Sequence, residues 1–272
     1  MLEKRSNSSY MQLPIYQLDT FTDKIFGGNP AAVLPLSAWL SDEVMQAIAA
    51  ENNLAETAFY VATESGFHIR WFTPTVEVDL CGHATLAAAF VLFTLENYPH
   101  DQISFDSRSG ILKVRREGDW LVLDFPADTF HKQLVSPPAL LEALRGIVPL
   151  EILRGKTDFM AVLENEEQVR TLQPDVIVLS TLPVRGVIIT ALGDSVDFVS
   201  RFFAPQSGVA EDPVTGSAHT TLAPYWAEKL GKTELSALQV SSRGGVLKTK
   251  VIGDRVEIAG QVKLYMKGTI EI

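Results

Sequence analysis

The sequence predicts an α+β protein of two pseudo-symmetric lobes, each made of strands wrapped around one buried central helix. Two internal matches carry this prediction. Residues 107–123 (SRSGILKVRREGDWLVL) recur as residues 242–258 (SRGGVLKTKVIGDRVEI) at a constant offset of 135. The segment RWFTPTVEVDLCGHAT from Arg70 recurs as RFFAPQSGVAEDPVTGSAHT from Arg201, with three extra residues before Glu211. Matches in the same order indicate two similar lobes, and the crevice between such lobes is where small ligands tend to bind.

We place the lobes at residues 11–127 and 128–272, with the last strand a candidate to cross back to the first lobe. The stretch from 126 to 138 breaks the periodicity and serves as the linker. Two lobes of about 130 residues each fit the usual size of a domain. Residues 1–10 lack an apolar core and are therefore interpreted as a short disordered leader, not a signal peptide.

In the first half of the chain, apolar runs and alternating patterns predict strands, and apolar residues at helical spacing predict helices. The predicted strands cover residues 15–21, 31–36, 57–62 and 67–72, and a hairpin covers 110–125. One helix begins at Ser41, a good N-cap residue, and ends near Asn52. The other follows Gly82-His83 and is apolar on all sides, which is typical of a buried helix.

The second half repeats this plan. Strands are predicted near 158–164 and 184–191, with a closing hairpin over 245–258. A glycine-containing loop at 211–217 leads into a helix from about Ala218 to Lys229, and Gly231 ends that helix as a C-cap. Each lobe thus has a central helix that follows a glycine-containing loop.

Composition excludes several classes of function. The formal net charge is −10 and no Lys/Arg run is present, so a nucleic-acid partner is not expected. The single cysteine cannot form an intrachain disulfide, which fits a reducing compartment. The longest apolar stretch, about residues 84–95, is too short for a bilayer. We expect a cytoplasmic protein with no membrane partner.

The loops that precede the two central helices are the first candidates for a site. A helix N-terminus has free N–H groups and a partial positive charge, which together bind anions. Gly82 and Gly216 allow a ligand to approach the backbone closely. If the loops face each other, they can hold a carboxylate or stabilise an enolate-like charge. The alternative is that both glycines serve only tight turns.

Three ionisable residues are candidates for acid/base chemistry. His83 and Asp212 lie on the two loops and could share and move a proton across the crevice. The alternatives are a capping or core histidine and an Asx turn before Pro213. Glu56 stands next to apolar residues, and partial desolvation suits a general acid/base. Its alternative is an exposed glutamate at the start of a strand.

Cys81 precedes Gly82 at the start of the first central helix. The helix N-terminus stabilises a thiolate there, so Cys81 could act as a base or nucleophile; the alternative is a small buried apolar residue. The matched position is Thr215, which excludes a symmetric two-thiol mechanism. Phosphate-loop, dinucleotide and metal-ligand motifs are absent from the sequence. We therefore expect neither a cofactor nor a metal.

Several segments resemble the phenazine-biosynthesis isomerase (PhzF-like) family. They are FGGNPAAVL, NNLAETAF, FTPTVEVDLCGHAT, EDPVTGSAH and the closing hairpin, and the match runs from about Met11 to the C-terminus. The resemblance implies the diaminopimelate epimerase-like fold, with two lobes that are each a rolled, mostly antiparallel sheet around a central helix. It also implies a homodimer and cofactor-free isomerisation by proton shuttling in the cleft between lobes. The implied site consists of catalytic Glu56, His83 and Asp212 and substrate-binding Gly82, Gly216 and Ser217.

One departure from the family pattern concerns the substrate. The phenazine enzyme has a serine just before its catalytic glutamate, and this chain has Ala55. The phenazine precursor is therefore in doubt as the substrate. The sequence predicts a cofactor-independent isomerase of a small carboxylic acid. Two alternatives stay open: a thiol-dependent racemase or epimerase with Cys81 as one base, and a non-catalytic ligand-binding protein on the same scaffold.

Overall fold

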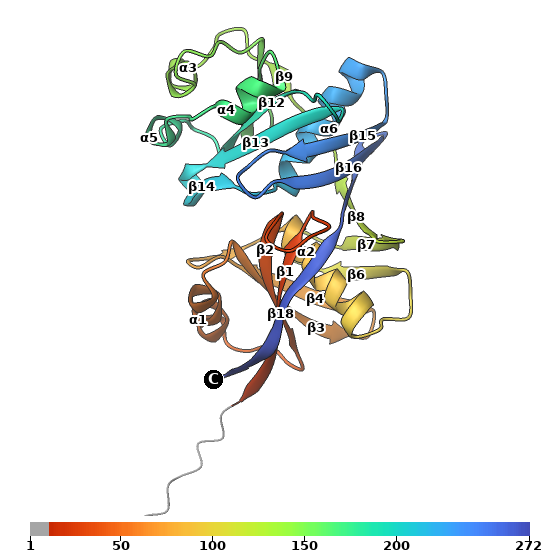
Figure 1. Cartoon of the computed structure of the whole chain (residues 1–272). Coiled ribbons are helices and arrows are strands. Elements are labelled where there is room, and N and C mark those ends of the chain that lie inside the picture. The colour runs from red at the N-terminus through yellow and green to blue at the C-terminus, as the bar shows by residue number, and fades with distance from the viewer. Residues whose placement is uncertain (1–10) are drawn as a thin grey trace, which may run out of the picture.

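The computed structural model describes residues 11–272 and confirms the predicted fold class. Two lobes are stacked one above the other, and the sheet of each lobe curls around one helix (Figure 1). These central helices are α2 (Gly82–Phe90) and α6 (Gly216–Leu230). One continuous apolar core contains buried residues of both helices, among them Leu86 and Leu222.

The first lobe contains most of the N-terminal strands and two helices. Its strands are β1 (Gln12–Thr20), β2 (Asn29–Leu36), β3 (Glu56–Thr63), β4 (Gly66–Phe72), β5 (Glu77–Val78), β6 (Gln102–Asp106), β7 (Leu112–Glu117) and β8 (Trp120–Pro126). Helix α1 (Asp42–Asn52) begins after the N-cap Ser41 and ends at Asn53, whose backbone is left-handed. Helix α2 continues into a short π-helical turn, η1 (Val91–Leu95), so the predicted all-apolar helix is one buried segment.

The second lobe has the same kind of construction with additional short helices. Its strands are β9 (His131–Lys132), β10 (Glu151–Arg154), β11 (Asp158–Val162), β12 (Gly186–Leu192), β13 (Phe198–Ala204), β14 (Val209–Asp212), β15 (Glu234–Gln239), β16 (Gly245–Ile252) and β17 (Arg255–Gly260). Its short helices are α3 (Pro138–Ala143), α4 (Glu166–Thr171), α5 (Val176–Leu179) and the 3-10 turn η2 (Pro205–Ser207). The turn η2 lies where the second copy has its extra residues.

The strands of the two lobes pair in the same pattern. A parallel pair (β2–β3, β11–β12) is followed by an antiparallel pair (β3–β4, β12–β13) and a second parallel pair (β4–β6, β13–β15). The repeated arginine and glutamate form the same ion pair in each lobe: Arg70 Nε lies 2.7 Å from Glu77, and Arg201 Nε lies 2.7 Å from Glu211. The repeated sequence therefore specifies a repeated local structure.

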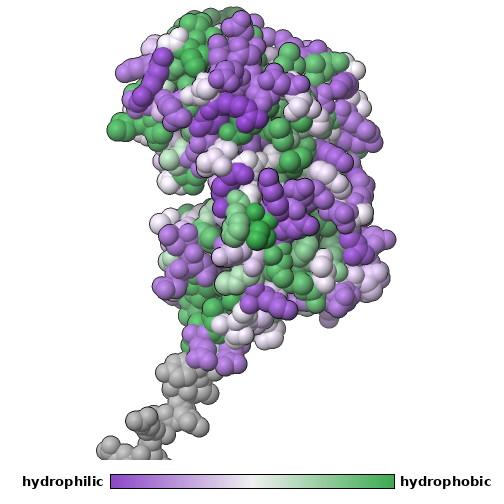
Figure 2. Space-filling model, viewed as in Figure 1, coloured by the Kyte–Doolittle hydropathy of each residue, from purple (hydrophilic) through white to green (hydrophobic). Residues whose placement is uncertain are grey.

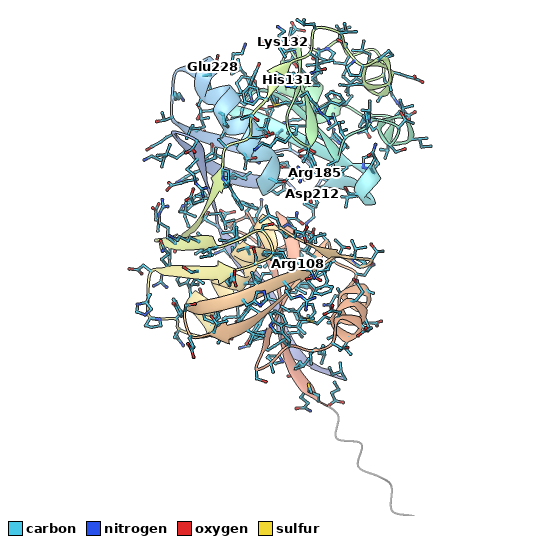
Figure 3. The ribbon with its side chains drawn as sticks, turned by 180° about the vertical axis from the view of Figure 1, so that it is seen from behind. Arg108, His131, Lys132, Arg185, Asp212 and Glu228 are labelled. Carbon is cyan, nitrogen blue, oxygen red and sulfur yellow. The ribbon has the colours of Figure 1, made fainter. Side chains whose placement is uncertain are left out.

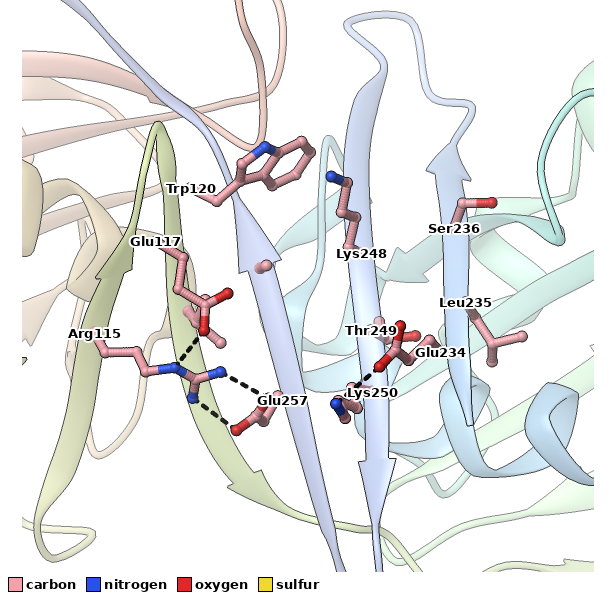
Figure 4. Close-up of a pocket in the computed structure, with 12 residues that line it drawn as sticks. Arg115, Glu117, Trp120, Glu234, Leu235, Ser236, Lys248, Thr249, Lys250 and Glu257 are labelled. Atoms are coloured by element: carbon pink, nitrogen blue, oxygen red, sulfur yellow. Dashed lines mark hydrogen bonds and ion pairs between the residues drawn. The ribbon is translucent and has the colours of Figure 1, made fainter. Parts of the chain in front are cut away.

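Strands from both lobes join along one boundary. Strand β17 pairs with β8 in antiparallel fashion. After β17 the chain returns to the first lobe, where β18 (Val262–Glu271) pairs with β1 along its whole length (Figure 1). On the outer face of the β8–β17 junction lies a shallow hollow of about 420 Å³, where Arg115 forms a two-pronged ion pair with Glu257 (Figure 4).

Some predicted boundaries were wrong. Helix α6 begins at Gly216 instead of Ala218, and α2 begins at Gly82, because the loop residues themselves adopt the first helical turn. Strands β10 and β15 and helices α3 to α5 were not predicted from sequence. No helix within residues 11–272 is long and apolar enough to cross a membrane.

His219, one turn into α6, is a fully buried titratable residue of the second lobe. Its Nδ1 donates to the Thr215 carbonyl at 2.8 Å, and its Nε2 has no partner within residues 11–272. Burial lowers the pKa of His219 to about 4. Because the unfolded chain takes up this proton at a higher pH than the folded chain, stability should be lost as pH falls from about 6.5 to about 4.

We expect the free energy of unfolding of the wild type to fall by about 3 kcal/mol more between pH 7 and pH 4 than that of His219→Gln. Glutamine retains an N–H donor for the Thr215 carbonyl but does not titrate. Urea unfolding of both proteins at the two pH values measures the difference, and other titrating groups cancel. An equal loss of stability in both proteins would show that His219 is not held neutral.

Candidate active site

A cleft of about 660 Å³ lies between the lobes. The surface is hollowed between them on the side of β14 (Figure 2). Residues of both lobes line this cleft, including Glu56, Cys81, Gly82 and His83 from the first and Asp212, Thr215, Gly216 and Ser217 from the second. Figure 3 shows Arg185 and Asp212 of the second lobe near its boundary with the first lobe. The structure therefore brings all six sequence-predicted site residues to one cavity.

The two glycines occupy matched places in the cleft. Gly82 is the first residue of α2 and Gly216 the first residue of α6, and both line the cavity. An added Cβ at Gly82 would lie 3.5 Å from Phe125, and one at Gly216 would lie 3.8 Å from Phe21, which are ordinary contacts. Packing within the protein thus does not require glycine at either position. Without a Cβ, a glycine at the start of a helix allows an anion to approach the backbone closely.

Glu56 and His83 approach each other closely. Glu56 is the first residue of β3 and keeps a 20% exposed side chain, whereas the His83 side chain at the start of α2 is buried. Glu56 Oε2 lies 3.1 Å from His83 Nε2. The two atoms lack the alignment of a hydrogen bond, and neither has another hydrogen-bond partner in the described chain. Both atoms are buried and face each other, and a proton can pass between them.

The Asp212 carboxylate at the end of β14 accepts two short hydrogen bonds. Oδ1 accepts from Asn29 Nδ2 at 2.8 Å and Oδ2 accepts from Thr215 Oγ1 at 2.5 Å. Despite these donors, burial raises the pKa of Asp212 to about 6. A carboxylate with that pKa can take up and release a proton near neutral pH. Asn29 was not identified as a site residue from sequence.

Of the two alternatives left open for Cys81, the structure favours the small buried residue. Its side chain is buried, and burial together with the Glu56 carboxylate raises the pKa of the thiol above its ordinary value. The alternative of a thiolate stabilised by the helix N-terminus is disfavoured, because the cost of burying the charge is larger. Sγ lies 3.5 Å from His83 Nδ1. Burial lowers the pKa of His83, but Cys81 and Glu56 oppose this and raise the pKa above its ordinary value.

Ser217 is held by a residue that sequence reasoning missed. Arg185 Nη1 donates to Ser217 Oγ at 3.0 Å, while Arg185 Nε donates to Asp158 at 2.9 Å. The arginine thus connects the ion pair with Asp158 to the first turn of α6. Its position just before β12 carries no local motif, so only the folded structure identifies it.

Glu56, Cys81 and His83 also have the spacing of a metal site, since their ligand atoms lie within 4.8 Å of one another. However, Cys81 faces Nδ1 of His83 and Glu56 faces Nε2. An imidazole coordinates an ion through one nitrogen, and coordination by Cys81 needs a thiolate, which its raised pKa opposes. The three groups fit proton transfer better than coordination of one ion.

Apolar side chains complete the wall of the cleft. They are Val76, Val78, Leu80 and Phe125 from the first lobe and Phe202, Ala204 and Val209 from the second. Ala55 also lines the cavity beside Glu56, so the departure from the family pattern lies at the site itself. The cleft is thus lined by ionisable side chains, by the first residues of two helices and by apolar side chains, a composition that suits a small ligand.

Known proteins resemble this chain over nearly its full length. A family model described as "Phenazine biosynthesis-like protein" matches residues 18–268. An uncharacterized isomerase of Pseudomonas aeruginosa is 54% identical over 262 residues, which cover 96% of this chain and 100% of the relative. The crystal structure of a PhzF family phenazine biosynthesis protein from Enterococcus faecalis has a TM-score of 0.93 and 47% identity, covering 96% of this chain and 100% of that chain.

A more distant solved structure with the same fold is an epimerase. The structure of a hydroxyproline epimerase from Agrobacterium vitis has a TM-score of 0.61 at 11% identity, covering 96% of this chain and 93% of that chain. At this identity the likeness shows a shared fold alone.

Proposed function

The chain belongs to the phenazine biosynthesis-like (PhzF) family of isomerases, and we propose that it isomerises a small carboxylic acid without a cofactor. The observation that carries this proposal is the distance of 3.1 Å between Glu56 Oε2 and His83 Nε2 at the N-terminus of α2. Glu56 Oε2 and His83 Nε2, which have no other hydrogen-bond partner in the described residues, would form an acid/base pair beside a helix N-terminus that can bind an anion.

In the proposed reaction, the N–H groups at the starts of α2 and α6 bind the substrate carboxylate. Glu56 takes a proton from a carbon that neighbouring unsaturation activates, and the double bond shifts. The proton returns to another carbon, so one C–H bond breaks, one forms and no electron is gained or lost. His83 shares the proton with Glu56, and Asp212 supports transfer from the opposite lobe. The helix N-termini stabilise the enolate-like charge that develops in between.

The experiment that tests this function is a screen of small unsaturated carboxylic acids in D₂O, followed by proton NMR. We expect one member to be isomerised, with deuterium at the newly formed C–H position wherever the shuttled proton exchanges with solvent. An acid that binds tightly by calorimetry but is never converted would instead support a non-catalytic binding protein.

The thiol-dependent alternative makes an opposite prediction for Cys81. We expect Cys81→Ser to keep kcat within about tenfold of the wild type, because the buried thiol is not the base and the serine hydroxyl can either donate to His83 Nδ1 or accept from it. Loss of a catalytic base would instead lower the rate by ~10²–10⁴-fold. Steady-state kinetics of the two proteins distinguish these outcomes, and circular dichroism establishes that the variant is folded. Near-total loss of activity in a folded variant would support the epimerase mechanism.

A further inference from the structure

Asn29, in the FGGNP segment, is the first residue of β2 and is fully buried. Its Nδ2 donates to Asp212 Oδ1 at 2.8 Å and to the Val214 carbonyl at 2.9 Å. The same nitrogen lies 3.4 Å from His83 Nδ1. One side chain of the first lobe therefore contacts an acid/base residue in each lobe.

The orientation of this amide is determined by its neighbours. Exchanging its oxygen and nitrogen would place Oδ1 against the Asp212 carboxylate and the Val214 carbonyl, two acceptors that cannot donate to it. The observed orientation leaves Oδ1 of Asn29 without a hydrogen-bond partner in the described residues. The fold accepts a buried polar atom without a partner in order to direct both N–H groups toward the second lobe.

The turn that carries Asn29 is clamped by the second lobe. Arg243 Nε donates to the Gly28 carbonyl at 2.8 Å, and Nη2 donates to the Gly27 carbonyl at 3.0 Å and to Asp19 Oδ1 at 2.7 Å. Gly28 N donates in turn to the Gly244 carbonyl at 2.8 Å. Gly28 has φ +62°, and an added Cβ would lie 2.0 Å from the Thr20 carbonyl oxygen, so only glycine fits there.

The arginine of the first lobe that corresponds to Arg243 in the repeat has a different partner. Arg108, which corresponds to Arg243 in the repeat, pairs within its own lobe with Glu77 at 2.6 Å. Arg243 instead crosses between lobes to Asp19. The clamp is thus a feature of one half of the repeat, and it lies at the turn that holds Asn29.

We propose that Asn29 is a positioning residue of the isomerisation, and that Arg243 and Asp19 hold the turn that carries it. This inference rests on the proposed function, in which Asp212 takes part in proton transfer. Asn29 and Thr215 supply the hydrogen bonds that favour an ionised Asp212 in a site where burial favours the neutral form. The charged groups around Asp212 are His83 of α2 and Glu56 of β3.

The test compares Asn29→Leu, an apolar residue of similar shape, with Asn29→Ser, which keeps one donor. A hydrogen bond to a charged group contributes enough that its loss should lower kcat by ~10–100-fold and move the acidic limb of the pH profile of kcat/KM upward by about one to two pH units. KM should change little, because the carboxylate is bound elsewhere. Asn29→Ser should lie between the wild type and Asn29→Leu, and Arg243→Met should shift the profile in the same direction.

Arg115→Met is the matched control. It removes a different ion pair between the lobes, which is two-pronged, with distances of 2.6 and 2.8 Å to Glu257, on the outer face of the sheet (Figure 4). We expect no change in kcat or in the pH profile. If Arg115→Met reproduces the effect of Arg243→Met, the clamp acts only through general stability and the inference is overturned.

Carbon-13 NMR titration of the Asp212 carboxyl, assigned with Asp212→Asn, provides a readout that needs no turnover. Its midpoint should rise in Asn29→Leu. Unchanged kcat and an unchanged midpoint, with Asp212→Asn inactive, would overturn the inference and leave the proposed function standing. If instead Glu56→Gln retains full turnover, the proposed function fails, and the titration still shows whether Asn29 keeps Asp212 ionised.

Discussion

We expect Glu56→Gln to lower kcat by ~10²–10⁴-fold, the contribution usual for general acid/base catalysis. Glutamine has nearly the same shape as glutamate but cannot accept and return a proton. Substrate binding should survive, because the carboxylate is assigned to the helix N-termini at Gly82 and Gly216. The substitution therefore separates the chemistry from the binding.

Two measurements establish this result. Isothermal calorimetry should give a similar Kd for both proteins, and NMR in D₂O should show deuterium in the product of the wild type but not of the variant. The matched control is Glu64→Gln, which neutralises an exposed carboxylate just beyond the end of the same strand β3. Unchanged turnover in Glu56→Gln would show that Glu56 has only a structural role at the start of β3, and the mechanism would have to be abandoned.

The local parts of the site could be predicted from sequence because they lie next to recognisable elements. Gly82 and His83 stand at the start of an all-apolar helix, and Gly216 follows from the internal match. Glu56 stands at the start of an apolar strand, as the structure has it. The two glycines needed only neighbouring residues, the internal match and the rule that helix N-termini bind anions, whereas the role predicted for Glu56 also rested on the resemblance to the PhzF-like family.

The parts that depend on long-range contacts could not be predicted. Asn29 is 54 residues from His83 and 183 from Asp212 along the chain, so no spacing rule connects them. The FGGNP turn was the available signal, but by itself it indicates only a turn. For β18 the sequence indicated only that the last strand could cross back to the first lobe; that its partner there is β1 is seen in the folded structure. The choice between the two alternatives for Cys81 also needed the structure, because burial raises the pKa of the thiol.

The second large effect that we expect is in Asp212→Asn, with kcat lowered by ~10²-fold or more if Asp212 takes part in proton transfer. Burial raises the pKa of Asp212 to about 6. Below that pH the carboxylate is increasingly protonated and cannot accept a proton, so kcat/KM of the wild type should fall as pH decreases through 6. Asparagine does not titrate, so the variant should lose this limb and keep a low, flatter profile.

The same substitution distinguishes a chemical role from a structural one. Asn29 can still donate to the side-chain oxygen of the new asparagine, so the contact between lobes is retained and the thermal midpoint should change little. A variant that keeps the wild-type acidic limb would show that another group titrates there, with His83 as the first candidate because it lies against Glu56. A variant with the wild-type rate at pH 7 would remove Asp212 from the mechanism, and proton transfer would then depend on Glu56 and His83 of the first lobe alone.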